Sequence, residues 1–151
     1  MLRSYFSTSY ELPSEDGVLR VSIDGDPVGD IAQLPDFLRS RFAILTGYNP
    51  RSMLLPRRVN ETRHQVLRDM LILGNYRVEH CVGYDEEPEG MWREPAWVAH
   101  GMDREEAIIY GRSFRQNTII YCQDARPELV VTDPTCDVVG KTYQGNWRVR
   151  S

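Results

Sequence analysis

The 151-residue chain is long enough to bury a substantial core, and its 41% hydrophobic and 26% charged residues exclude a chain that is disordered over most of its length. The formal net charge of −4 argues against general nucleic-acid binding, because proteins of that class usually carry a basic surface. We therefore expect a single globular domain over residues 1–151.

The cysteines and the hydropathy pattern indicate a cytoplasmic protein. Cys81, Cys122 and Cys136 are too few and too scattered for a disulfide framework or a CxxC metal pair. No stretch approaches the roughly 20 apolar residues of a membrane span. The N-terminal "MLRSYFSTSYELP" also lacks the apolar core of a signal peptide. The three histidines are dispersed, with no carboxylate or cysteine at ligand spacing, so the sequence predicts no metal site.

The first predicted elements are a β-hairpin and a short helix. Residues 4–12 are rich in aromatic and hydroxyl side chains, and residues 18–24 alternate apolar with polar side chains. The segment "SEDG" between them is typical of a turn. The segment "AQLPDFLRSRF" predicts a short helix with Pro35 in its first turn. "FAILT", residues 42–46, predicts a short apolar strand in the centre of a sheet.

The rest of the chain predicts two longer helices and further strands. A helix is expected over 60–73, with Asn60 as its N-cap and Gly74 as its stop. Strands are expected over 76–84 and 94–101, a helix over 103–114, and strands over 117–122, 128–133 and 146–150. The middle therefore has the β-α-β-β-α-β order of ferredoxin-like proteins. We expect an α+β fold in which helices pack on a single-layer mixed or antiparallel sheet.

The predicted helix over 60–73 carries polar residues on its apolar face. Its stripe of Leu67, Met70 and Leu71 extends backwards, in steps of three and four, to Arg63 and Asn60. A helix N-terminus has free N–H groups that suit a carboxylate or a phosphate. In the alternative interpretation, Asn60 only caps the helix and Arg63 reaches into solvent.

The stretch "LTGYNPRS", residues 45–52, is expected to follow a strand and to meet the start of that helix. Asn-Pro favours a turn, and this turn would bring Asn49, Arg51 and Ser52 to an edge of the sheet where ligands often bind. The arginines between residues 51 and 68 suit a small anionic ligand, although a solvated arginine face is the commoner explanation. Nucleic-acid binding is a third interpretation, and only the basic stretch over residues 51–68 supports it.

Two further segments carry candidate site residues. Trp92 and Glu94 point the same way in an extended chain, so they could stack on and hydrogen-bond a planar ligand, with Glu94 as acid or base. Alternatively, Trp92 packs under the acidic loop "DEEPEG" and Glu94 pairs with Arg63. Gln116 and Asn117 place two amides at a helix-to-strand junction, where they satisfy helix-end carbonyls or face a ligand.

Several familiar catalytic signatures are missing from the sequence. It contains no Walker A loop, GxGxxG, HExxH or GxSxG motif. No pattern in it identifies a cofactor or a nucleophile.

The ordered motifs resemble an uncharacterised bacterial family of small domains of unknown function (number 3293 type). The motifs are Y-x-x-T-x-Y from Tyr5 to Tyr10, then "TGYNPRS", "NETR", "WREP" and "FRQN", and the resemblance spans about residues 5 to 122. Gly47 stands where the family usually has alanine. The resemblance implies no activity or cofactor. The matching positions are Thr46, Asn49, Pro50, Asn60, Arg63, Trp92, Glu94, Pro95, Gln116 and Asn117.

Two functions follow as hypotheses. In the first, the protein binds a small anionic or nucleotide-like ligand; if it is an enzyme, Glu94 is the general acid or base and Arg63 stabilises charge. The other ligand-binding candidates are Thr46, Asn49, Arg51, Ser52, Asn60, Trp92, Gln116 and Asn117. In the second, the protein is an interaction or regulatory module, defence- or phage-related, that binds a protein partner or a second copy. The polar residues then form a structural network.

Overall fold

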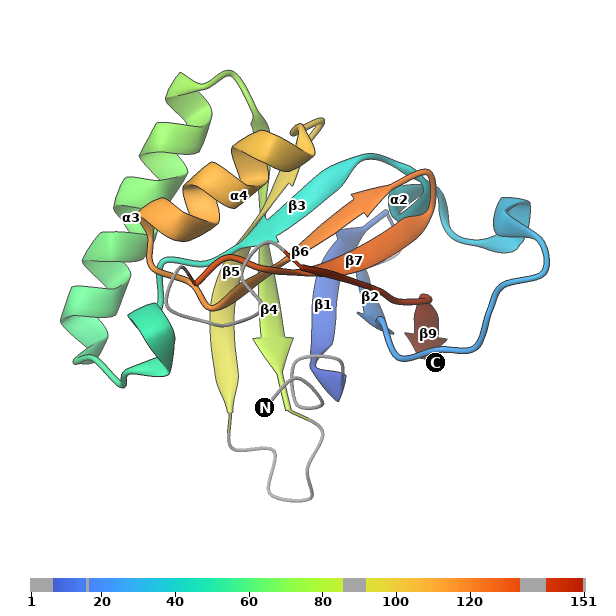
Figure 1. Ribbon diagram of the computed structural model, residues 1–151, viewed down its shortest axis with the longest axis horizontal. Coiled ribbons are helices and arrows are strands. Elements are labelled where there is room, and N and C mark those ends of the chain that lie inside the picture. The colour runs from blue at the N-terminus through green and yellow to red at the C-terminus, as the bar shows by residue number, and fades with distance from the viewer. Residues whose placement is uncertain (1–6, 16, 86–91, 134–140, 151) are drawn as a thin grey trace.

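The chain folds into a curled antiparallel sheet with α-helices packed on it, which is the α+β architecture that the sequence predicts (Figure 1). The computed structural model describes residues 7–15, 17–85, 92–133 and 141–150. The strands are β1 (Ser9–Ser14), β2 (Gly17–Ser22), β3 (Phe42–Leu45), β4 (Arg77–Tyr84), β5 (Arg93–His100), β6 (Thr118–Gln123), β7 (Arg126–Val131), β8 (Thr142–Gln144) and β9 (Arg148–Arg150). The helices are α2 (Asp36–Arg39), α3 (Arg57–Leu73) and α4 (Arg104–Ser113), with 3-10 helices over Ile31–Gln33 and Pro50–Ser52.

The strands within the described residues form a nine-stranded sheet in the order β8-β7-β6-β3-β5-β4-β1-β2-β9. Each neighbouring pair of strands is antiparallel. The hairpin β1–β2 and the short helix α2 precede β3, as the sequence predicts. The elements that follow in the chain are β3, α3, β4, β5, α4 and β6.

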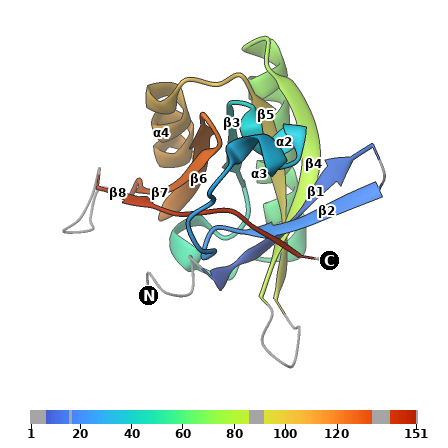
Figure 2. The same ribbon diagram turned by 90° about the vertical axis from the view of Figure 1, so that its right-hand side faces the viewer.

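The C-terminal segment joins the two edges of this sheet. Strands β8 and β9 lie at opposite edges, yet only Gly145, Asn146 and Trp147 separate them in the chain. The backbone N–H of Asn146 donates to the carbonyl of Ile23 at 2.8 Å. The buried Trp147 ring stacks on Phe42 with 6.0 Å between ring centroids. The sheet therefore curls around an inner core (Figure 2). The sequence predicts an edge strand at the C-terminus but not strand β8.

The alternation of side chains along the strands creates a core on each face of the sheet. In β3, Phe42 and Ile44 belong to the inner cluster, whereas Ala43 and Leu45 belong to the cluster beneath the helices. Strand β6 divides in the same way. The inner cluster also holds Leu12, Val21, Ile23, Leu38, Cys81, Ala96, Val98 and Trp147. The outer cluster also holds Leu67, Leu71, Ala99, Met102, Ala107 and Phe114.

The register of the central strands sets the place of the candidate site. Leu45 pairs with Trp97 on β5, and Ile44 pairs with Ile120 on β6. The end of β3 therefore lies beside the starts of β5 and β6. Residues that follow β3 or begin β5 and β6 meet at this end of the sheet.

Helix α3 begins three residues earlier than predicted. It starts at Arg57 after Pro56, so Asn60 lies inside the helix, and the prediction of Asn60 as N-cap is wrong. The proline fixes its own backbone in an extended conformation and begins the helix without a side-chain cap. The buried face is Asn60, His64, Leu67 and Leu71, whereas Met70, which the pattern placed on the apolar stripe, is 41% exposed.

No helix within the described part of the chain is long and apolar enough to cross a membrane.

Candidate functional site

Thr46 ties the loop after β3 to strand β5. Its hydroxyl donates to the carbonyl of Pro95 at 2.8 Å and accepts the backbone N–H of Tyr48 at 3.0 Å. Since Pro95 lies just after Glu94, this bond holds the loop against the start of β5. The Thr46 hydroxyl therefore extends the contact between these segments beyond the end of the β3–β5 ladder.

Asn60 holds the Asn-Pro turn against α3. Its Oδ1 accepts the backbone N–H of Asn49 at 2.9 Å, and its Nδ2 donates to Asn49 Oδ1 at 2.8 Å and to the Leu55 carbonyl at 3.2 Å. Asn60 is only 4% exposed, so these bonds satisfy an amide that water does not reach. The prediction that this amide lies near the turn is confirmed, but its bonds are all to the loop.

Arg63 binds two backbone segments. Its Nε donates to the Gly47 carbonyl at 3.0 Å and its Nη2 donates to the Phe114 carbonyl at 2.7 Å. Burial lowers the pKa of Arg63, with the nearby Arg115 charge adding to this. The ion pair between Arg63 and Glu94 considered from the sequence is absent among the described residues. Arg63 therefore connects the loop after β3 to the segment between α4 and β6.

His64 supports the same loop from the buried face of α3. Its Nδ1 accepts the Gly47 N–H at 3.2 Å, and its ring stacks on Trp97 at a centroid distance of 4.5 Å and an interplanar angle of 11°. Burial lowers the pKa of His64 to about 4, and the His80 charge adds to this. His64 is thus a neutral structural histidine, and Trp97 Nε1 donates to its carbonyl at 2.9 Å.

Gln116 and Asn117 bind the far side of the turn. Gln116 Nε2 donates to the carbonyls of Tyr48 and Phe114, both at 3.2 Å. Asn117 Nδ2 donates to Ser52 Oγ at 2.8 Å. Gln116 is buried, and its amide therefore joins the segment before β6 to the loop after β3. Gln116 binds the carbonyl of Phe114 at the end of α4 and also lines a pocket, so both interpretations of this amide retain support.

Glu94 is the acidic group of the site. Its Oε2 accepts a hydrogen bond from Asn49 Nδ2 at 3.3 Å. Burial raises the pKa of Glu94 to about 7, and the hydrogen bond from Asn49 opposes this change. A carboxyl group with this pKa exchanges its proton near neutral pH, which is the property of a general acid or base.

These residues surround a pocket of about 150 Å³. The predicted residues that line it are Thr46, Asn49, Ser52, Trp92, Glu94, Gln116 and Asn117. Three other predicted residues, Arg51, Asn60 and Arg63, do not belong to its lining. The pocket lies on the inner face of the curled sheet, where Ile44, Ala96 and Ile120 form its floor.

The sequence interpretation omitted several lining residues from the site. Thr8, Tyr10, Gly83 and Thr118 all contribute to the pocket. Thr8 and Tyr10 belong to the Y-x-x-T-x-Y motif, so the resemblance contained a signal for them. Their position becomes evident only when Tyr10 pairs with Gly83 across β1 and β4. Tyr5 and most of the acidic loop, residues 86–90, lie outside the described residues.

The backbone around the pocket is unusually strained. Asn49, Arg51, Ser52 and Arg115 have φ values of 46°, 53°, 60° and 56°. Residues other than glycine adopt this left-handed region at an energetic cost, and such residues concentrate at functional sites. The strain persists here because the bonds of Asn60, Arg63 and Gln116 hold the loop in place.

Comparison of the chain with known proteins identifies a family but no characterised relative. Residues 45–119 match the family described as "Protein of unknown function (DUF3293)". No curated protein and no solved structure matches the chain. The matched range runs from the last residue of β3 into β6 and includes all the predicted site residues. The resemblance to this family is therefore confirmed over residues 45–119.

Proposed function

Because this chain belongs to the family described as a protein of unknown function (DUF3293), we propose a function from its own pocket. The pocket binds the planar ring of a small, polar, nucleotide-like ligand, and Glu94 holds or transfers a proton on that ring. The observation that carries the proposal is the Glu94 carboxyl group, which lines the pocket and has a pKa of about 7. Near neutral pH such a group can both accept and donate a proton.

The size and chemistry of the pocket support a single ring. Its volume of about 150 Å³ is close to that of an apolar cavity that holds one benzene molecule. Trp92 lines the pocket and is 40% exposed, so its indole is available to stack on a ring at the entrance. The amides of Asn49, Gln116 and Asn117 supply donors and acceptors for the polar edge of the ring.

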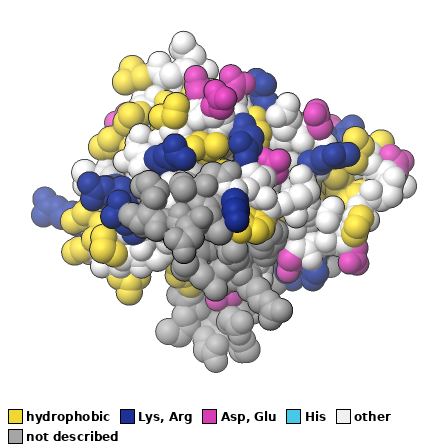
Figure 3. Space-filling view, viewed as in Figure 1, with side chains coloured by type: hydrophobic (Ala, Val, Ile, Leu, Met, Phe, Trp, Pro, Cys, Tyr) yellow, Lys and Arg dark blue, Asp and Glu magenta, His cyan; other side chains and the backbone are white. Residues whose placement is uncertain are grey.

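An anionic group on the ligand would lie outside the pocket. No lysine or arginine is among the described residues that line it. Arg51 and Arg115 are both exposed, and the backbone N–H of Arg51 donates to the Arg115 carbonyl at 2.7 Å. They precede the lining residues Ser52 and Gln116 in the chain. Basic side chains also gather over the first half of α3, where Arg57 is exposed (Figure 3).

Glu94 and Arg63 have different roles in this proposal. If the protein catalyses hydrolysis or group transfer, Glu94 is the general acid or base. Arg63 uses Nε and Nη2 on the Gly47 and Phe114 carbonyls, so we assign it a positioning role in place of direct charge stabilisation. It fixes the loop that carries Asn49 and thereby the environment of Glu94.

We also propose that the elements β3-α3-β4-β5-α4-β6 form a ferredoxin-like unit, and the order of their strands in the sheet, β6-β3-β5-β4, supports this proposal. We propose in addition that the protein is cytoplasmic, because Cys81 and Cys122 are both free thiols.

A second candidate function is an interaction module in which the polar residues are structural. Two observations support it. The side-chain bonds of Asn60 and Arg63 all go to the loop and to backbone carbonyls. The pocket is also smaller than the roughly 300–1,000 Å³ of most ligand sites.

The experiment that tests the first proposal is a thermal-shift panel of nucleobases, nucleosides and nucleotides at pH 7. A ligand present at 100 times its Kd stabilises the folded state by roughly 2.7 kcal/mol, which is a clear rise of the midpoint. The panel is run on the wild type, on Glu94→Gln and on the double variant Arg51→Ala/Arg115→Ala. The exposed Gln65→Ala serves as a matched surface control.

We expect compounds of one ring class to raise the midpoint of the wild type and of Gln65→Ala, but not that of Glu94→Gln. The double arginine substitution should weaken the binding of nucleotides more than the binding of the matching nucleosides. If no compound shifts the wild type, the ligand proposal is wrong and the structural network is the better explanation.

A further inference from the structure

Strand β1 leaves β4 halfway along its length. The two strands pair only from Ser9–Glu11 to Val82–Tyr84, whereas β4 continues back to Arg77 and pairs there with β5. Figure 2 shows the β1–β2 hairpin turning away from this part of β4. Within the described residues, no strand pairs with the outer edge of β4 between Arg77 and Cys81. This half of β4 is therefore an open edge inside a nine-stranded sheet.

The position of Pro95 on β5 shows which residues of β4 direct their backbone N–H and carbonyl groups toward this edge. Pro95 has no N–H, and its carbonyl accepts the Thr46 hydroxyl, so its backbone faces β3. Val82 pairs with Pro95 and consequently directs its own N–H and carbonyl away from β5, toward β1. Because backbone direction alternates along a strand, His80 and Val78 point the same way, where β1 no longer lies. No backbone bond outside the ladders involves either residue in the described chain.

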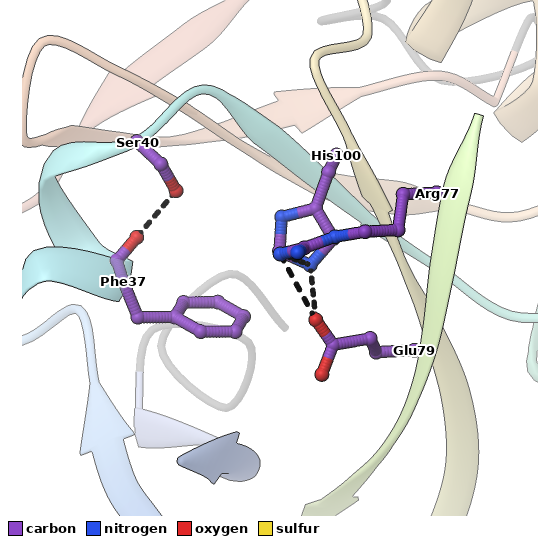
Figure 4. Close-up of polar contacts among 5 residues, drawn as sticks. All are labelled: Phe37, Ser40, Arg77, Glu79 and His100. Atoms are coloured by element: carbon purple, nitrogen blue, oxygen red, sulfur yellow. Dashed lines mark hydrogen bonds and ion pairs between the residues drawn. The ribbon is translucent and has the colours of Figure 1, made fainter. Parts of the chain in front are cut away.

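A groove of about 650 Å³ lies beside this edge. Phe37, Arg77, Glu79 and His100 are among its lining residues, and their side chains converge in Figure 4. Glu79 Oε1 binds Arg77 Nη2 at 3.1 Å and His100 Nε2 at 2.9 Å. The Phe37 ring meets the His100 ring edge-on at 5.2 Å. The groove thus combines an aromatic wall with a carboxylate that already holds a guanidinium group.

The charge of the groove favours a basic partner. Glu15, Asp36 and Glu79 carry three negative charges and Arg77 one positive charge, which gives −2 while His100 is neutral. Burial lowers the pKa of His100, Arg77 adds to this, and Glu79 opposes it. Arg39 pairs with Asp36 from outside the groove, and its charge reduces the sum to −1. A partner with positive side chains is therefore complementary to this end of the sheet.

We propose that the open edge of β4 binds an extended, basic segment of a partner protein as an added strand. The backbone groups of Val78 and His80 supply the hydrogen bonds, and alternate side chains of the segment enter the groove between Phe37 and Glu79. This site is separate from the Glu94 pocket. Glu94 and His100 are six residues apart on β5, which places the two sites about 20 Å apart at opposite ends of the inner face.

The test is a selection of random heptapeptides displayed on phage, with binding measured afterwards by fluorescence anisotropy of the synthetic peptides. Peptides are selected on the wild type and counter-selected on His80→Pro, which removes the N–H at the open edge. The ladder to β5 should survive because this N–H does not face β5. His80→Ala is the matched control, and Glu79→Gln tests the charge requirement.

We expect enrichment of peptides that alternate apolar and basic residues. Their Kd should rise at least tenfold in His80→Pro, stay within about twofold in His80→Ala, and rise in Glu79→Gln for basic peptides. Three results would overturn the proposal: no enrichment on the wild type over His80→Pro, enrichment of acidic peptides, or a wild-type homodimer that His80→Pro abolishes. The last result would place a second copy of the chain on the edge.

A measurement on the unmodified protein keeps the proposal testable if His80→Pro does not fold. Hydrogen exchange should be fast at the amides of Val78 and His80 and slow at Glu79, whose N–H faces β5. Slow exchange at Val78 and His80 in the free protein would mean that the edge is already covered, which contradicts the proposal.

Discussion

Asn49 and Asn60 bind each other twice: Asn60 Oδ1 accepts the Asn49 backbone N–H at 2.9 Å, and Asn60 Nδ2 donates to Asn49 Oδ1 at 2.8 Å. The pair joins a left-handed turn residue to the buried face of a helix eleven residues later in the chain. Since Asn49 also donates to Glu94, the helix controls the environment of the acidic group through this amide.

Replacement of Asn60 by alanine should lower the free energy of unfolding by about 2–4 kcal/mol. The substitution leaves the Asn49 N–H and the Leu55 carbonyl without their buried partner, and each unsatisfied group costs about 1–3 kcal/mol. Urea denaturation measures the change. Thr62→Ala, at an exposed position of the same helix, is the control and should change stability by about 0.5 kcal/mol or less. A loss below about 1 kcal/mol for Asn60→Ala would contradict a structural role for the pair.

Glu94 should make the folded protein less stable as the pH rises. Its pKa changes from 4.5 to about 7 on folding, so the folded state holds the proton more tightly. The stabilising contribution of the neutral carboxyl is complete below pH 4.5 and is lost as the pH rises through 7. Glu94→Gln should therefore gain about 2–3 kcal/mol over the wild type between pH 4.5 and pH 8, after allowance for partial exposure.

Denaturation curves at several pH values, together with NMR titration of the Glu94 carboxyl carbon, measure this effect. Glu105→Gln, at an exposed position on α4, is the control and should follow the wild-type pH dependence. A constant difference between Glu94→Gln and the wild type across this range would show that burial does not raise the pKa of Glu94.

His64 should have the opposite effect. Burial lowers its pKa from 6.5 to about 4, so the unfolded state binds the proton more readily. Its contribution to stability is complete above pH 6.5 and is lost as the pH falls through 4, by about 3 kcal/mol. In the shared range between pH 4.5 and 6.5 the contributions of His64 and Glu94 offset each other. NMR titration of the His64 ring protons provides the check, and a midpoint near 6.5 would refute the prediction.

Gly47→Ala should destabilise the loop after β3. A Cβ at Gly47 would lie 2.7 Å from the Cα of His64 and 2.8 Å from the carbonyl carbon of Arg63, both of them backbone atoms of α3. The helix would have to move away, and overpacking of this kind typically costs about 1–3 kcal/mol. Thermal denaturation compares this variant with Gly29→Ala, where a Cβ meets no atom within 4 Å. Equal midpoints for the two variants would mean that the loop and the helix separate easily.

The Gly47 substitution also tests how the contact with α3 affects the pocket. If Gly47→Ala lowers both the stability and the pKa of Glu94, then the close contact of Gly47 with α3 helps to set the chemistry of the pocket.

The sequence by itself determined several strands and the face that helix α3 turns to the core. Period-two alternation predicts strands because successive side chains point to opposite faces, and this pattern predicted β2. The apolar run of β3 predicted a central strand. The step of three and four along α3 identified Arg63 and Asn60 as neighbours of the apolar face. These are local properties, and a local pattern is sufficient to predict them.

The tertiary structure decided what those residues do. Asn60 is a buried hydrogen-bonding residue and not a cap because Pro56 starts the helix one turn earlier. Arg63 binds Gly47 and Phe114, since packing of α4 beside β3 brings a distant carbonyl within reach. The pKa of Glu94 depends on burial, which no sequence spacing specifies.

The curl of the sheet was also beyond the sequence. Only three residues separate β8 from β9, but they connect opposite edges of the sheet because Trp147 packs on Phe42 inside it. Closure depends on pairings between segments more than one hundred residues apart, such as Asp24 with Asn146. Local propensity carries no information about such pairings, so the inner face and both of its ends are products of long-range packing.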